Sequence, residues 1–301
     1  MPKIETIFRK YTSHINTLID NEIDSSLEKD LYICPICLKS FSLDQIDKLS
    51  LEDAPPYALG GKKIAVTCKI CNNTCGYTID SHLSNFIKYI EEKQFLPGSD
   101  RKIKIFDDDN QVNGKLEIGE NSSLTVKLPI KFNNPKTLEN HISTLDKDSI
   151  IYIQDDPLKI DMKKVSVSIL KTAYIILYSK FGYTFLLDKF YDDLRMQILN
   201  PSRYIIPDLW TKQSSILVND GVYLSDNNNY KGFFVIFTLK NIIEHRFCIC
   251  IPCPILYYEW IAEYFKKYKP GMPIYLLSLN HNDYLNNVDN IKSIKDWVRR
   301  W

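Results

Sequence analysis

The sequence lacks any apolar run long enough to span a membrane, and it lacks an excess of charge of either sign. A membrane-spanning helix needs about 20 consecutive apolar residues, whereas the most apolar stretches, Ala173–Tyr178 and Phe233–Phe237, are far shorter. The 38 Lys and Arg residues are balanced by 37 Asp and Glu, so a nucleic acid would be bound by local basic or metal-assisted contacts. The first residues alternate charged and apolar side chains and lack the continuous apolar core of a secretory signal. These absences predict a cytoplasmic protein with no membrane partner.

Composition indicates neither disorder nor internal repetition. The 301 residues allow about two folded units, and 45% apolar with 25% charged residues is typical of a folded chain. Eight cysteines occur without an export signal, and a reducing compartment favours metal binding over disulfides. Five of them fall within the 42 positions from Cys34 to Cys75. The other three lie in an apolar run, Cys248–Cys253, which predicts a buried strand.

Hydrophobic periodicity divides the chain into three predicted parts. Apolar side chains recur every three or four residues from Ile4 to Ile19, which predicts an amphipathic helix within residues 1–30. The cysteine-rich unit follows at 31–95, and Pro97-Gly98 marks its end. Residues 96–301 are predicted to form a mixed α+β domain of unassigned role. Its expected elements are a β meander at 102–130, a core helix at 165–181, and strands at 232–251 and 273–279.

Two Cys-x-x-Cys pairs carry the most specific signal. The pairs Cys34/Cys37 and Cys68/Cys71 are separated by 30 residues. Together they supply the four thiolates that tetrahedral zinc binds at about 2.3 Å. The alternatives are four unrelated buried cysteines, or a redox pair, which should occur once and precede a helix in a βαβ unit. Because a zinc ion with four protein ligands has no open position, we predict a structural Zn²⁺ that joins two chain segments.

The segment between and after these pairs resembles the HNH endonuclease family, specifically its four-cysteine ββα-metal subgroup. The resemblance covers about Leu31 to Leu83 and rests on the Cys-x-x-Cys pairs, an acidic dipeptide followed by prolines, Leu-Gly-Gly, and an Asn directly after the fourth cysteine. It implies a zinc-stapled hairpin and helix with a catalytic Mg²⁺ or Mn²⁺ site. In this mapping Glu52 is an acidic metal ligand, Asp53 takes the position of the general base, and Asn72 is the helical ligand.

Asp53 stands where the family usually has histidine. A histidine with a pKa near 6.5 can accept a proton at neutral pH, whereas an aspartate near 3.9 is several hundred times less basic. Asp53 could still act if its pKa is raised, or if it binds the metal, which then lowers the pKa of its own water. Adjacent strand residues point to opposite faces, so Glu52 and Asp53 cannot both reach one metal unless the Pro55-Pro56 bend rearranges the backbone. We favour Asp53 as the working residue.

Two further side chains on the predicted helix are candidates for the site. Asp80 shares a helix face with Asn73, Gly76 and Tyr77, and it could be a carboxylate that orients the site or a solvated surface group. His82 lies off that face, so it is either a surface histidine or a substitute base. The candidate catalytic residues are therefore Asp53, Glu52, Asn72, Asp80 and His82.

The sequence thus predicts an α+β chain in which a zinc-stapled ββα-metal module precedes a mixed domain. The expected reaction is hydrolysis of phosphodiester bonds in nucleic acid, with DNA as the expected partner, and analogy suggests bacterial defence. The domain after residue 95 would choose the substrate, a partner or a trigger. The sequence does not decide whether the chain forms a homodimer or binds a partner protein of a defence system. The alternatives are an inactive HNH-like zinc module that binds nucleic acid or protein, and a purely structural zinc ribbon.

Overall fold

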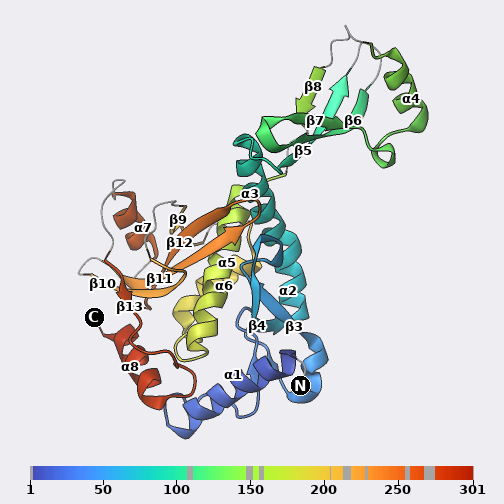
Figure 1. The fold of residues 1–301 in the computed structure, drawn as a ribbon. Coiled ribbons are helices and arrows are strands. Elements are labelled where there is room, and N and C mark those ends of the chain that lie inside the picture. Colours follow the sequence, from blue (N-terminus) through green and yellow to red (C-terminus); the bar gives the residue numbers. More distant parts are fainter. Residues whose placement is uncertain are drawn as a thin grey trace. The chain divides into compact units, whose positions relative to one another are not determined.

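The computed structural model shows a mixed α+β chain, which confirms the predicted class (Figure 1). It describes residues 3–106, 111–146, 152–155, 159–203, 205–212, 218–227, 230–254, 258–267 and 275–300. The helices are α1 (Lys3–Asp20), α2 (Lys69–Cys75), α3 (Ser81–Lys93), α4 (Pro135–Thr144), α5 (Met162–Phe181), α6 (Asp192–Leu199), α7 (Tyr258–Lys266) and α8 (Val288–Arg299). Within the described ranges, no helix is both long and apolar enough to cross a membrane.

The strands form four antiparallel sheets among the described residues. Two are hairpins, β1 (Tyr32–Ile33) with β2 (Ser40–Phe41), and β3 (Leu49–Ala54) with β4 (Lys62–Cys68). The third has the order β7-β6-β5-β8 and the fourth the order β13-β10-β11-β12-β9. Their bounds are β5 (Asp100–Phe106), β6 (Gln111–Ile118), β7 (Leu124–Lys127), β8 (Tyr152–Asp155), β9 (Trp210–Lys212), β10 (Gly221–Asn227), β11 (Tyr230–Lys240), β12 (Glu244–Pro252) and β13 (Leu277–Ser278).

The chain divides into two compact units, and the division differs from the predicted one. Unit 1 comprises Met1–Ser84, Asp161–Lys240 and Glu244–Trp301, and unit 2 comprises Asn85–Ile160 and Asn241–Ile243. The predicted boundary after residue 95 therefore lies inside unit 2, and the cysteine-rich region shares its unit with most of the C-terminal half. The reason is helix α5, which the sequence assigned to a separate domain.

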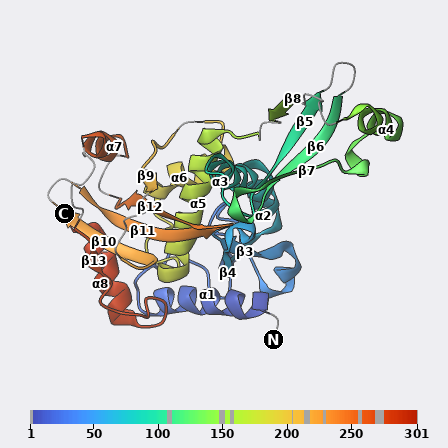
Figure 2. The same cartoon turned by 45° about the horizontal axis from the view of Figure 1, so that its top comes forward.

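Helix α5 forms the centre of unit 1. It was expected at 165–181 and is found at Met162–Phe181. The side chain of Asp161 caps its first turn by accepting hydrogen bonds from two backbone N–H groups. It lies between the hairpin β3–β4 and the strands β11 and β12, so that it is buried on nearly every side (Figures 1 and 2). Gly182 ends the helix with φ of 56°, and a Cβ there would lie 2.4 Å from the ring of His14.

The N-terminal helix is amphipathic, as predicted, and its apolar face is part of the unit 1 core. Phe8, Tyr11, Ile15 and Leu18 are all buried. Tyr11 stacks on Tyr178 of α5 with ring centroids 4.5 Å apart. The predicted N-terminal segment is thus an integral layer of unit 1.

His14 of α1 is buried as a neutral side chain, which predicts a specific acid sensitivity. Its Nδ1 lies 2.7 Å from the carbonyl oxygen of Leu285, and burial lowers its pKa to about 4. Because the unfolded chain binds this proton near pH 6.5, the contribution of His14 to stability is present above that pH and is lost as the pH falls toward 4. The wild-type free energy of unfolding should fall by about 2 kcal/mol more than that of His14→Asn between pH 7.5 and 5.

Urea unfolding at both pH values measures this difference. His281→Asn, at an exposed histidine, is the matched control and should keep the wild-type pH dependence. Equal slopes for the wild type and His14→Asn would contradict the assignment.

The C-terminal sheet of unit 1 has buried strands at its centre. Strand β11 is buried along almost its whole length, which agrees with its run of aromatic and β-branched residues. Cys248 and Cys250 lie on β12 and Cys253 directly follows it, and the strands predicted within 232–251 are found as β11 and β12. The strand expected at 273–279 is found only as Leu277–Ser278, and residues 273–274 lie outside the described ranges.

Unit 2 is built on the sheet β7-β6-β5-β8. The meander predicted at 102–130 corresponds to β5, β6 and β7, and β8 adds a fourth strand beside β5. Helix α4 contacts β6, and its Leu138 joins Ile103, Ile105, Val112 and Leu116 in a small core. The carboxylate of Glu91 in α3 accepts hydrogen bonds from the side chain of Asn241 and from the backbone N–H groups of residues 242 and 243. These bonds explain why residues 241–243 belong to unit 2.

Candidate functional site

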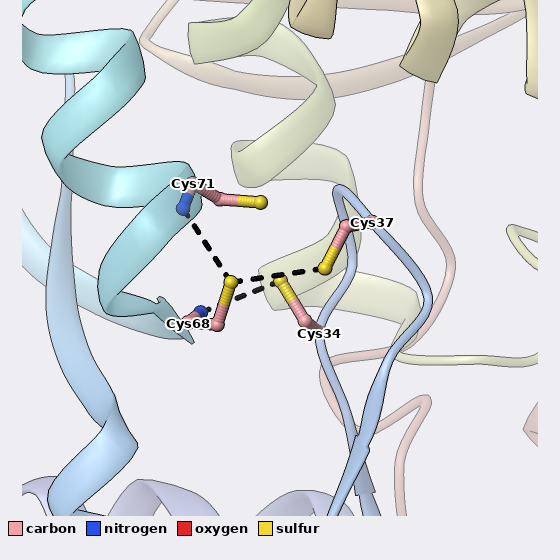
Figure 3. Close-up of side chains that lie close together, drawn as sticks. All are labelled: Cys34, Cys37, Cys68 and Cys71. Carbon is pink, nitrogen blue, oxygen red and sulfur yellow. Dashed lines mark hydrogen bonds between the residues drawn. The ribbon is translucent and has the colours of Figure 1, made fainter.

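The four cysteines of the two pairs come together, as the spacing predicts (Figure 3). Cys34 and Cys37 lie in the turn of the β1–β2 hairpin, Cys68 ends β4, and Cys71 lies in the first turn of α2. Their four Sγ atoms lie within 4.8 Å of one another, and the Sγ atoms of Cys37 and Cys68 are 3.7 Å apart. A tetrahedral site with metal–sulfur bonds of about 2.3 Å requires sulfur separations of about 3.8 Å. The donor set therefore fits a zinc ion.

Backbone N–H groups and burial complete the environment of this cluster. The N–H of Cys68 lies 3.4 Å from the Sγ of Cys34, and the N–H of Cys71 lies 3.4 Å from the Sγ of Cys68. Such bonds favour the thiolate form that binds metal. Among the described residues, no other group of three or more His, Cys, Asp or Glu side chains gathers in this way.

Three tyrosines on and after α5 hold the first cysteine pair in place. The hydroxyl of Tyr174 donates to the carbonyl oxygen of Pro35 over 2.9 Å, between Cys34 and Cys37. The hydroxyl of Tyr183 donates to the carbonyl oxygen of Ile33 over 2.6 Å and accepts from the N–H of the same residue. Tyr178 contacts Tyr183 through its hydroxyl at 2.9 Å. The position of the cluster thus depends on a segment more than 130 residues later in the chain.

The hairpin β3–β4 leads directly into α2, and Asn72 joins the two. Its Nδ2 donates to the Oγ of Ser50 and to the carbonyl oxygen of Leu51, each over 2.8 Å. Only glycine fits at position 61 in the hairpin loop, because a Cβ there would lie only 1.6 Å from the carbonyl oxygen of Pro55. The amide nitrogen of Asn72 therefore positions strand β3 relative to the helix, a role that its predicted assignment as a metal ligand does not include.

Glu52 and Asp53 are separated by an irregularity in strand pairing. Glu52 pairs with Ala65 and Asp53 pairs with Lys63, so the register shifts between them. Glu52 is 2% exposed, and its two oxygens accept from the Nζ of Lys171 over 2.8 Å and from the Oγ1 of Thr67 over 3.0 Å. The predicted ligand role of Glu52 does not fit this geometry, because both oxygens already have partners in the protein interior.

Lys171 of α5 is the centre of a buried charged cluster that the sequence analysis missed. Its side chain is 1% exposed, and its Nζ contacts Glu52 at 2.8 Å and Asp80 at 2.6 Å. Asp80 also accepts from the Oγ of Ser168 over 2.7 Å. We refer to Glu52, Asp80 and Lys171 as the buried triad. Asp80, predicted to orient the site, therefore acts on strand β3 through Lys171.

The carboxylates keep Lys171 charged despite its burial. Burial alone would lower the pKa of Lys171, but the negative charges of Glu52 and Asp80 raise that pKa above its ordinary value. For Glu52, burial raises the carboxyl pKa, and the Lys171 ammonium opposes this shift. The neighbouring Cys75 thiol is uncharged at neutral pH, because burial raises its pKa to about 12. Cys75 is a small buried residue, as the sequence predicts.

Asp53 differs from the triad because part of its carboxylate has no partner. The side chain is partly exposed, but its Oδ1 is buried and accepts no hydrogen bond from the described residues. Burial raises the pKa of Asp53, and the nearby charges of Lys63, Lys3 and Lys171 oppose that shift. The carboxylate thus lies in a basic environment with one buried oxygen available as an acceptor.

His82 is engaged at the start of α5. Its Nδ1 accepts a hydrogen bond from the backbone N–H of Asp161 over 3.1 Å, and Asp161 caps that helix. The structure thus gives His82 a role in joining α3 to α5, and its role as a substitute base stays a prediction.

Comparison with known proteins identifies no relative. No protein-family model, no curated protein and no solved structure matches the chain. The function must therefore be argued from the side chains described above.

Proposed function

We propose that unit 1 contains a zinc-stapled, divalent-metal-dependent endonuclease module of the HNH type, with Asp53 as its working carboxylate. The observation that carries this proposal is the buried Oδ1 of Asp53, which has no partner among the described residues. A buried acceptor without a partner costs about 1–3 kcal/mol. A bound cation would supply the partner that this oxygen lacks among the described residues, and it would thereby remove that cost.

The residues around Asp53 fit a magnesium-type ion in one respect and not in another. Mg²⁺ keeps several waters and is commonly bound by one or two carboxylates together with substrate phosphates. Asp53 satisfies this requirement, whereas Glu52 does not, because Lys171 and Thr67 occupy its oxygens. When bound, such a cation stabilises charge on the scissile phosphate and lowers the pKa of its bound water.

The chain's own contribution is to fix one carboxylate in a basic setting. Asn72 ties strand β3 to helix α2 just before Asp53, and Lys171 and Thr67 anchor the adjacent Glu52. The backbone that carries the Asp53 carboxylate therefore has little freedom to move. Lys63 and Lys3, whose charges act on Asp53, would neutralise a phosphate that approaches it.

The substrate class follows from the proposed chemistry. We propose nucleic acid, with DNA first, and a role in bacterial defence remains an analogy from the sequence. Metal-dependent phosphodiester hydrolysis commonly uses a fixed carboxylate and nearby positive charge, and the carboxylate of Asp53 with the charges of Lys63 and Lys3 supports the proposal.

A second candidate function is supported by the internal bonds of Glu52 and Asn72. Both side chains that the resemblance assigns as metal ligands make hydrogen bonds within the protein, and Asp53 replaces the usual histidine. A module with one available carboxylate could bind nucleic acid or a partner protein without cleaving it. This candidate predicts a stable, zinc-containing chain without hydrolytic activity.

Nicking of supercoiled plasmid DNA, and cleavage of a labelled RNA, with Mg²⁺ or Mn²⁺ separate the two candidates. We expect Asp53→Ala to lower the cleavage rate by at least about 100-fold, while zinc content and thermal midpoint stay unchanged. Asp47→Ala, at an exposed aspartate, is the matched control and should cleave normally.

Asp53→His adds a second readout, because it introduces the base that the resemblance expects. Asp53→His should cleave faster than Asp53→Ala. A folded, zinc-loaded wild type that cleaves neither DNA nor RNA would eliminate the nuclease proposal and favour the binding function.

A further inference from the structure

In the sheet of unit 2, strands β5 and β6 pack one face on α4 and have a mainly polar opposite face. Ile103 and Ile105 of β5 and Val112 and Leu116 of β6 point toward α4 and form the core. Since successive strand residues point to opposite faces, the intervening residues lie on the other side. Antiparallel sheets commonly have one packed and one solvated face. We refer to the second side as the open face, which is made of Asp100, Lys102, Lys104, Phe106, Gln111, Asn113, Lys115, Glu117, Thr125, Lys127, Tyr152 and Gln154.

Strand pairing arranges this face in rows. Lys127, Lys115 and Lys102 are direct cross-strand neighbours on β7, β6 and β5. Two residues further along β5, Lys104 pairs with an asparagine and a glutamine. Two residues beyond that, Phe106 pairs with Tyr152, whose side chain is 62% exposed. Successive rows are about 7 Å apart, so a basic region merges into an aromatic region on the same surface.

The charges on this face are only partly balanced. Lys115 contacts Asp100 at 3.0 Å and Glu117 at 3.2 Å, and Lys127 contacts Glu117 at 2.6 Å. Lys102 and Lys104 form no ion pair in the part of the chain that the structure describes. The open face therefore carries four lysines and only two carboxylates. Like charges directly opposite one another destabilise a sheet, so the row of lysines has an electrostatic cost that a bound polyanion would remove.

We propose that the open face of unit 2 binds single-stranded nucleic acid. Lys102 and Lys104 contact backbone phosphates, and Tyr152, with Phe106 beside it, provides a surface on which a base stacks. Exposed aromatic side chains next to basic residues suit single strands, because a duplex keeps the faces of its bases inside the stack. This inference goes beyond the proposed nuclease, since such binding needs neither Asp53 nor a catalytic metal.

Fluorescence anisotropy with a labelled 12-nucleotide oligo(dT) or oligo(U) tests the proposal. The full chain with Asp53→Ala is used without added Mg²⁺ or Mn²⁺, so that binding is read without cleavage. Lys102→Glu with Lys104→Glu should raise Kd at least tenfold and reduce the slope of log Kd against log salt by about 1.4. Tyr152→Ala should raise Kd by about tenfold with an unchanged salt slope, because stacking is not ionic.

Lys88→Glu with Lys136→Glu is the matched control. It makes the same charge change at exposed lysines on α3 and α4, and it should change Kd by less than twofold. The proposal is overturned if both lysine pairs weaken binding equally, if neither oligonucleotide binds, or if polyglutamate binds with the same dependence on Lys102, Lys104 and Tyr152. Because no arm measures cleavage, failure here is distinct from failure of the nuclease proposal.

Discussion

Replacing Lys171 with methionine should lower the free energy of unfolding by about 3–5 kcal/mol. The substitution leaves the Glu52 carboxylate 2% exposed and without its ammonium partner, and a buried unpaired charge is far more costly than a lost methylene contact. Urea unfolding at pH 7.5, followed by circular dichroism, measures the loss. Lys163→Met, at an exposed position on the same helix, is the control and should cost less than about 0.5 kcal/mol.

A double variant and a second pH distinguish loss of charge from loss of packing. Lys171→Met with Glu52→Met removes both charges, and it should be at least about 1 kcal/mol more stable than Lys171→Met alone. In Lys171→Met, burial keeps the folded-state pKa of Glu52 above its unfolded value, so stability is lost as the pH rises. The variant should therefore be less impaired at pH 5 than at pH 8. A loss that is independent of pH and unaffected by the second substitution would contradict the role assigned to the triad.

Removing one cysteine of the cluster should have the largest effect of all. We expect one zinc per chain, and we expect Cys34→Ser or Cys71→Ser to abolish zinc retention and cooperative unfolding of unit 1. Structural zinc sites bind with about 10–16 kcal/mol in small peptides, which is comparable to the entire stability of a typical domain. Metal analysis of the purified chain and thermal unfolding provide the two measurements.

Cys75→Ala is the matched control for this experiment. Cys75 is buried in the same helix one turn after Cys71, but it does not belong to the four-sulfur group. Its removal should preserve the zinc content and cost only about 1 kcal/mol. A wild-type chain purified without zinc, or a Cys34→Ser chain that keeps it, would remove the basis for a metal-stapled module.

The parts of the fold that follow from local spacing were predictable. Four thiolates in two Cys-x-x-Cys pairs specify one cluster almost regardless of the remaining chain, and apolar periodicity located α1 and α5 within a few residues. The alternation of strand side chains also indicated that Glu52 and Asp53 face different ways. Glu52 faces the interior, where Lys171 and Thr67 bind it, and a single sequence does not reveal which of the two does so.

The contacts that could not be predicted are non-local. Lys171 meets carboxylates 119 and 91 residues earlier in the chain, and no sequence pattern links positions at such separations. One signal was present, since a lysine amid the apolar residues of 169–177 has no obvious route to solvent. Ser168, Lys171, Tyr174 and Tyr178 recur at three and four, which is a polar stripe on an otherwise apolar helix. Recognising that stripe would have placed α5 against the cysteine-rich region.

The insertion of 76 residues between the two halves of unit 1 has a consequence for how the protein is made. Lys171 leaves the ribosome 100 residues after Cys71, which corresponds to about 5–20 s of translation. During that interval Glu52 must be hydrated or protonated. The tyrosines of the later segment cannot yet bind the backbone around Cys34 and Cys37. Metal capture by the four sulfurs can therefore precede α5 during synthesis, whereas final burial of the charged triad cannot.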